Sequence, residues 1–377
     1  MFQHRFLFTF AIIAMLVLAG CSGNRAAMSG PVFFPPAPNP PRVQYLTGVA
    51  SSKDVETAQD KLSLFQVGAG EQKEVIPLVK PFGVAVHGTK VYLAEASGKI
   101  DIIDFVHKQF GTLKGDFGAG KLKKPTGLAL DKEGNLFVAD TQRKEVVMYD
   151  PDGNFVQAVG KNLNMKPVAV AVDGSFLYVL DIINSLVKVL DRKTGELVRE
   201  IGKGIGKDDS LAVPIGMTLD SEGFLHITNA LSGKIMKFDR DGHLVHSFGQ
   251  LGDAFGEFGR PRGIETDREG ITYVVDASHQ NVQMFNEKGR LLMFFGDPGL
   301  PVGSLNLPAD VVVGYEGIDY FQKLADPSFK LEKIIFVTNQ YGNAKLAIYG
   351  FGHKKTDEEL KAEREQKEKQ KEKGEKK

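Results

Sequence analysis

Cysteine and tryptophan are nearly missing from this 377-residue chain, which has one cysteine and no tryptophan. A single cysteine excludes a disulfide within one chain and excludes the cysteine clusters that hold structural zinc or iron–sulfur centres. The formal net charge is zero, because 47 Lys and Arg residues balance 47 Asp and Glu residues. A neutral chain has no overall electrostatic attraction for nucleic acid, so we expect no nucleic-acid partner.

The one long apolar run, Phe6–Leu18, lies near the N-terminus and is too short to span a membrane. It follows a basic start and ends at Leu18-Ala19-Gly20-Cys21. This end resembles the lipobox of bacterial lipoproteins, which implies removal of residues 1–20 and a lipid anchor on Cys21 in the cell envelope. By the same resemblance, Ser22 favours the outer membrane. An uncleaved anchor helix and a secretory signal with a chance cysteine are the alternatives.

Both ends of the chain differ in composition from its middle. Residues 21–41 are rich in Gly, Ala and Pro, which predicts an extended tether after the lipidated Cys21. Residues 353–377 are mostly Lys, Glu and Gln without an apolar face, which predicts a solvated helix or a disordered tail. A charged solubilising end and an arm that binds a partner are both compatible with this tail.

Glycine is abundant, at 42 residues, and part of it belongs to a motif that returns six times. The motif is Pro-x-Gly, or a close variant, followed by a β-type run, and its copies start 42 to 47 residues apart. A period of this length predicts a propeller or a solenoid rather than unrelated domains. The six copies start at Pro81, Pro125, Pro167, Pro214, Pro261 and Pro308.

Each repeat predicts four short strands joined by turns that contain glycine. Four-stranded units of this size bury their faces only by stacking on one another around an axis. The sixth repeat contains an insertion, 314–333, and ends after its third strand. The segment Val43–Leu46 supplies the missing strand, so we predict an all-β domain over residues 42–352, a six-bladed β-propeller closed by its N-terminal strand.

The repeat resembles the NHL repeat, and residues 125–160 and 261–296 match it best. The resemblance covers about 270 residues and implies a six-bladed propeller, but a fold does not specify a function. Ala169 and Asp310 depart from the pattern because they replace the repeat glycine.

Acidic or amide residues end the second strand of every repeat, and these ends are expected on one face of the ring. Oxygen ligands of this kind suit calcium, so an axial Ca²⁺ site would use Asp140, Asp181, Asn229 and Asp276. The structural alternative is that each residue binds the backbone of the turn that follows it. No other cofactor is indicated.

Residues that break the repeat are the better candidates for function, because the repeat does not explain them. Arg262 stands where the other repeats have uncharged residues, Glu265 lies on the same inner strand, and Arg260 comes just before it. This charged group predicts recognition of a polar ligand, or an internal pair in which Arg262 and Glu265 neutralise each other.

His279 and Gln280 follow Asp276 in a turn on the same face, and Tyr341 lies in the matching turn of the sixth repeat. With Arg260, Arg262 and Glu265, they form the predicted contact surface. We therefore expect a membrane-anchored, non-catalytic binding or scaffold module that engages protein partners of the bacterial envelope. A calcium-dependent hydrolase or lyase and a ligand-binding sensor are the alternatives.

Overall fold

The computed structural model of the chain describes residues 30–56, 74–203, 210–300, 302–361 and 365. The predicted signal peptide, Cys21 and the first part of the predicted tether lie outside these residues. None of the helices in the described ranges is both long and apolar enough to cross a bilayer.

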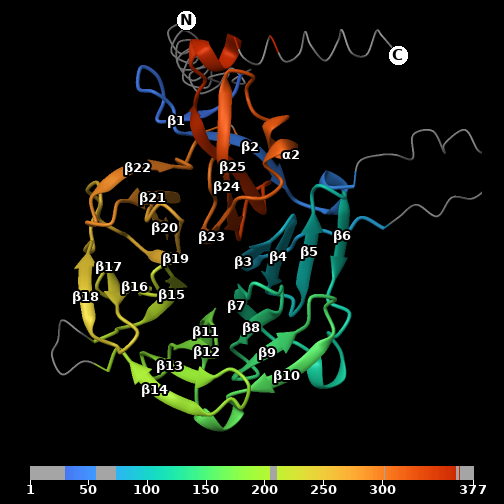
Figure 1. The fold of residues 1–377 in the computed structure, drawn as a ribbon, viewed down its shortest axis with the longest axis vertical. Helices are drawn as coiled ribbons and strands as arrows, with labels where there is room; N and C mark the ends of the chain where they lie inside the picture. The colour runs from blue at the N-terminus through green and yellow to red at the C-terminus, as the bar shows by residue number, and fades with distance from the viewer. Residues whose placement is uncertain (1–29, 57–73, 204–209, 301, 362–364, 366–377) are drawn as a thin grey trace, which may run out of the picture. The chain divides into compact units, whose positions relative to one another are not determined.

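Six antiparallel sheets form a ring of blades around a central axis (Figure 1). This confirms the six-bladed β-propeller. The strands of blades 1 to 3 are β3 (Pro81–His87), β4 (Lys90–Glu95), β5 (Ile100–Asp104) and β6 (Gln109–Thr112); β7 (Pro125–Leu130), β8 (Leu136–Asp140), β9 (Glu145–Tyr149) and β10 (Phe155–Val159); and β11 (Pro167–Asp173), β12 (Phe176–Asp181), β13 (Leu186–Asp191) and β14 (Leu197–Ile201).

Blades 4 and 5 repeat this four-stranded pattern, whereas blade 6 has five strands. Blades 4 to 6 consist of β15 (Pro214–Leu219), β16 (Leu225–Asn229), β17 (Lys234–Phe238) and β18 (Leu244–Phe248); β19 (Pro261–Thr266), β20 (Thr272–Asp276), β21 (Asn281–Phe285) and β22 (Leu291–Phe295); and β23 (Pro308–Gly314), β24 (Phe329–Asn339), β25 (Leu346–Lys354), β2 (Val43–Val49) and β1 (Phe33–Phe34). Short helices are η1 (Ser52–Asp54), η4 (Gly118–Gly120), η5 (Lys161–Leu163) and α2 (Ile318–Gln322).

The repeat proline begins the inner strand of every blade, as the sequence predicts. A strand tolerates proline at its first residue because no ladder hydrogen bond needs the missing N–H there. In blade 2, Pro125 lies opposite Asp140, the last residue of the second strand, and the other blades repeat this register. In four blades, glycine follows two residues later because the inner strands approach closely; a Cβ on Gly127 would lie 2.6 Å from the Cα of Ala169 in the next blade.

The ring closes through the N-terminal strand, as predicted. β2 pairs antiparallel with β25 and places Tyr45 opposite Tyr349. The preceding segment differs from the prediction, because β1 pairs with β2 and Phe34 is buried against Phe295 and Tyr349. Val32 is buried as well, so residues 32–34 of the predicted tether are packed on blade 6. Their apolar side chains outweigh the extended preference of the neighbouring prolines.

The insertion of blade 6 is shorter than the predicted 314–333, because β23 includes Gly314 and β24 begins at Phe329. Between them, α2 buries Phe321 against Phe105 of blade 1 and Phe336 of blade 6. At the C-terminal end, β25 continues to Lys354, two residues beyond the predicted boundary. Residues 357–361 are helical.

The antiparallel order gives the ring two distinct faces. We call the linker face the one with the blade-to-blade linkers and the turns between second and third strands. The opposite face has the turns between first and second and between third and fourth strands, and α2. The inner strands run away from the linker face, so their prolines lie close to it.

Candidate functional site

The residues that end the second strands are buried in all six blades. Each accepts a hydrogen bond from the backbone N–H of the linker that enters the same blade. The donors are Lys80 to Glu95 at 2.8 Å, Lys124 to Asp140 at 3.0 Å, Lys166 to Asp181 at 2.9 Å, Ala212 to Asn229 at 2.7 Å, Arg260 to Asp276 at 3.0 Å and Asn306 to Asn339 at 3.0 Å. These side chains therefore fix the linkers, in agreement with the structural alternative.

The structure does not gather the proposed calcium ligands into one site. Asp140, Asp181, Asn229 and Asp276 each end a strand in a different blade. Across the described ranges, no three His, Cys, Asp or Glu side chains form a group that suits a metal ion. The described residues therefore do not supply the axial calcium site of the sequence hypothesis.

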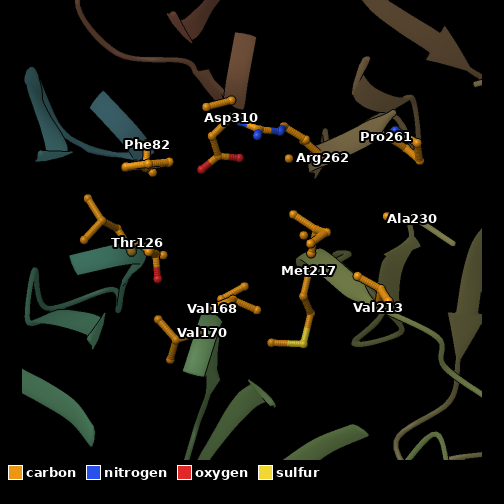
Figure 2. A pocket seen from close by; sticks show the side chains of 18 of the residues that line it. Phe82, Thr126, Val168, Val170, Val213, Met217, Ala230, Pro261, Arg262 and Asp310 are labelled. Carbon is orange, nitrogen blue, oxygen red and sulfur yellow. The ribbon is translucent and has the colours of Figure 1, made fainter. Parts of the chain in front are cut away.

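A pocket of about 330 Å³ opens at the mouth of the central channel on the linker face. The inner strands of all six blades line it, together with linker and turn residues such as Val213, Ala230 and Arg260. Figure 2 shows Arg262 and Asp310 on one side of the pocket and Val168 and Val170 on the other. The wall is largely apolar, with few charged groups, which is the usual composition of a small-molecule site.

Arg262 is the charged member of a ring formed by the second residue of each inner strand. The equivalent residues in the pocket wall are Phe82, Thr126, Val168, Ile215 and Ala309. Burial and the neighbouring Arg260 lower the pKa of Arg262, although an arginine side chain remains charged in proteins. Among the residues that the structure describes, its guanidinium has neither an ion-pair partner nor a hydrogen-bond acceptor.

The predicted internal pair between Arg262 and Glu265 is wrong. Glu265 instead accepts a hydrogen bond from the Thr218 hydroxyl of blade 4 at 3.1 Å. Burial raises the pKa of Glu265 to about 8, and the nearby Asp310 and Asp267 contribute in the same direction. The two side chains are three positions apart on a strand that contains a bulge, and successive strand residues face different directions.

Asp310 replaces the repeat glycine in blade 6 and contributes a carboxylate to the pocket. It accepts hydrogen bonds from the backbone N–H groups of Val84 at 3.1 Å and Val311 at 3.0 Å. Burial raises its pKa to about 7, against the effect of these two bonds. Asp310 therefore joins blade 6 to blade 1 across the seam of the ring. The sequence marked it as a departure from the repeat but did not suggest this contact.

His279 lies on the linker face, as expected, but it is held by two carboxylates. Its Nδ1 lies 2.9 Å from Asp276 and its Nε2 lies 3.1 Å from Asp253. Gln280 has a positive φ of 56°, like Lys144 and Ser185 at the equivalent turns of blades 2 and 3. Gln280 is therefore a turn residue of the repeat, whereas His279 connects the turn to the preceding linker.

Tyr341 is exposed on the linker face beside two lysines. The Lys80 ammonium donates a hydrogen bond to the Tyr341 hydroxyl at 2.9 Å and lies 4.6 Å from its ring centre. This hydrogen bond lowers the pKa of Tyr341. Of the predicted contact residues, Arg260 and Arg262 line the pocket, whereas Tyr341 lies outside it. Asp276 is buried and Glu265 is bound to Thr218, so the predicted residues do not form one contact surface.

Sequence reasoning missed the concentration of exposed apolar side chains on the linker face. Within the described ranges, large apolar residues are also exposed on the outer strands, but only Val106 and Leu324 are exposed on the opposite face. Those on the linker face are Val75, Ile76, Val79, Phe117, Ile183, Val213, Leu231, Leu251, Phe255, Val302 and Tyr341. The sequence contained a signal for them, because large apolar residues at predicted turns and linkers are unusual in segments that are normally polar.

Basic residues precede the repeat proline in four blades, at Lys80, Lys124, Lys166 and Arg260. Their backbone N–H groups bind the buried acids of the second strands, but the side chains of Lys124, Lys166 and Arg260 extend into solvent. The repeat acids are thus buried while these cations remain exposed. The mouth of the pocket is surrounded by positive and apolar groups.

No family model matches the chain. A segment of 144 residues is 26% identical to the protein brain tumor of Drosophila melanogaster, covering 36% of this chain and 13% of that protein. A protein of unknown function from Bacteroides thetaiotaomicron is similar in structure, with a TM-score of 0.57 and 16% identity over 82% of this chain and 75% of that one.

A gluconolactonase from Xanthomonas campestris gives a TM-score of 0.54 at 16% identity and covers 85% of this chain and 97% of that one. Identities this low show the fold alone. The chain is thus a six-bladed β-propeller with NHL-like repeats, and similar folds include enzymes. The function must be argued from its own residues.

Proposed function

We propose that this protein is a non-catalytic binding module that recognises a protein partner through its linker face. The observation that carries this proposal is the concentration of exposed apolar side chains on that face, around a pocket whose wall contains Arg260 and Arg262. Exposed apolar side chains that gather on one face of a protein typically mark an interaction surface. Phe255 is 82% exposed and Phe117 is 72% exposed, so both are suited to insert into a partner.

Hydrogen bonds at the described ends of the linkers support recognition by a preformed surface. In each blade, a buried acid or amide holds a linker residue just before the inner strand, so these residues lose little entropy when a partner binds. Basic side chains at the mouth favour a partner with acidic residues at the matching positions. We place this partner in the bacterial envelope because the N-terminal pattern resembles a lipobox, with the membrane anchor on Cys21.

The surface proposal is tested by a photo-reactive residue placed at Phe255 or, as a control, at Leu324 on the opposite face, in intact cells of the source bacterium. A discrete protein adduct at position 255, absent at 324 and lost when Phe117 and Leu231 are changed to Ser, would support the proposal. Equal adducts at both positions, or none at 255, would overturn it.

The anchor is tested separately by labelling with a fatty-acid analogue. Wild type should incorporate the label and be shortened, whereas Cys21→Ser should remain an unlabelled precursor. Labelling of Cys21→Ser would contradict the lipid anchor without affecting the surface proposal.

A further inference from the structure

We infer that the Arg262 pocket binds the carboxylate end of an apolar ligand, whose hydrocarbon part lies in the channel mouth. This inference rests on the proposed function, because it names the chemistry that the linker face would recognise at its centre. The ligand chemistry has two sources, a free monocarboxylic acid and the C-terminal residue of a partner chain.

Arg262 carries a charge that no described acid neutralises. Its side chain is half-buried at the pocket wall, so part of its hydration is lost without an acceptor that replaces it. Four of the other five blades place an apolar side chain at this position, and the remaining one places Thr126 there. The ring fold therefore does not need a cation here. A carboxylate would supply two acceptors in the planar geometry that the guanidinium fork matches.

The acids near Arg262 are already engaged by other groups. Glu265 is bound to the Thr218 hydroxyl, and Asp310 is bound to the backbone N–H groups of Val84 and Val311. Neither forms an ion pair with Arg262. The guanidinium is thus available to an external anion, and Arg260 in the wall adds a second positive charge.

The wall of the pocket favours a monoanion with an apolar body. Leu128, Val168, Val170 and Met217 line the pocket and offer apolar contact to the ligand. A phosphate or sulfate dianion would bring a second negative charge close to Asp310 and would leave the apolar wall uncovered. A volume of about 330 Å³ lies at the lower end for ligand sites, so it accommodates a small ligand such as an acylated amino acid.

The test is calorimetric titration of the full chain with N-acetyl-leucine and with its neutral amide. The acid should bind one molecule per chain, and the amide should bind at least about tenfold more weakly, as expected for losing one charged hydrogen-bonded pair. Equal affinity for acid and amide, or no binding of the acid, would overturn the inference. This comparison needs no variant and so does not depend on how a variant folds.

Two substitutions locate the binding. Arg262→Gln should weaken binding of the acid by about tenfold or more, whereas Arg290→Gln, in a turn on the opposite face, should leave the affinity unchanged. An unchanged affinity in Arg262→Gln would contradict the site. Melting temperatures of both variants show whether each still folds.

The source of the carboxylate is distinguished with the peptide acetyl-Ala-Val-Leu. Tighter binding than that of N-acetyl-leucine would indicate a chain terminus that continues over the linker face, and equal binding would indicate a free acid. Carboxylate binding without an adduct at Phe255 would support the carboxylate site and overturn the protein-partner proposal. An adduct at Phe255 without carboxylate binding would support the protein-partner proposal and overturn the carboxylate site.

Discussion

The two faces of the propeller use their charged side chains in different ways. On the opposite face, charges pair between neighbouring blades: Arg192 with Asp131, Arg240 with Asp173, and Lys333 with Asp267. On the linker face, the repeat acids are buried against the backbone, and the side chains of Lys124, Lys166 and Arg260 are exposed. The comparison indicates that both faces stabilise the ring by different contacts, and that the linker face in addition leaves cations exposed.

The largest loss of stability is expected from removing the ion pairs of the buried Lys333 on the opposite face. Its ammonium is 3% exposed and lies 2.5 Å from Asp267 and 2.7 Å from Glu269. Lys333→Ala would leave the buried Asp267 carboxylate without its cation, which costs about 3 to 5 kcal/mol of unfolding free energy. Denaturant titration measures this loss.

Lys330 on the same strand is the matched control, because it pairs with Glu359 at the surface. Lys330→Ala should cost at most about 1 kcal/mol, as exposed ion pairs usually do. Similar losses for both variants would contradict the distinction between a buried stabilising pair and a surface pair.

Glu265 lies in the channel between the two faces, and its titration should make the free energy of unfolding depend on pH. Its pKa is raised from 4.5 in the unfolded chain to about 8 in the fold, so the folded protein binds the extra proton between these values. Stability should therefore fall as pH rises from about 4.5 to about 8, by at most about 5 kcal/mol in total. Glu265→Gln keeps an acceptor for Thr218 and should flatten this profile.

Melting temperatures of wild type and Glu265→Gln across this pH range test the prediction. Asp310 has a pKa of about 7, also raised by burial. In Glu265→Gln, stability should therefore still fall as pH rises, but less steeply than in wild type. Parallel profiles for the two proteins would show that Glu265 does not carry the proton.

A smaller effect is expected at His279 on the linker face. His279→Ala removes contacts with the buried Asp276 and the exposed Asp253, but Asp276 keeps its backbone hydrogen bonds. The expected loss is about 1 kcal/mol, near the usual net value of one hydrogen bond. A loss above about 3 kcal/mol would show that charge pairs stabilise the ring on the linker face as they do on the opposite face.

The smallest effect on stability is expected at Phe255, because its side chain is 82% exposed. Phe255→Ser should change the unfolding free energy by less than about 0.5 kcal/mol, while it weakens partner binding. Leu324→Ser on the opposite face is the control for binding. Equal weakening by both would remove the distinction between the faces.

The fold was predictable from the sequence because each of the six repeats independently indicates the same four-stranded blade. Six prolines with a regular spacing fixed the inner strands, and the missing strand of the last repeat indicated closure by Val43–Leu46. The packing of Phe34 and α2 was not predictable, because these residues lie outside the repeat and bury against side chains that are distant in sequence.

The candidate site was predicted only in part. Arg262 stood out because it breaks the repeat, and the structure places it in the pocket as an unpaired cation. Its pairing with Glu265 was wrong because spacing along a strand does not give side-chain direction after a bulge. The contact between Asp310 and Val84 depends on ring closure, and 226 residues separate the partners.

The central claim, that the linker face is occupied in the cell, is tested most directly by cysteine protection. Phe255→Cys and Leu324→Cys would each be treated with a membrane-permeant maleimide in intact cells and as purified protein. We expect position 255 to be protected in cells and reactive after purification, while position 324 reacts equally in both. Equal reactivity of position 255 in both preparations would contradict this claim.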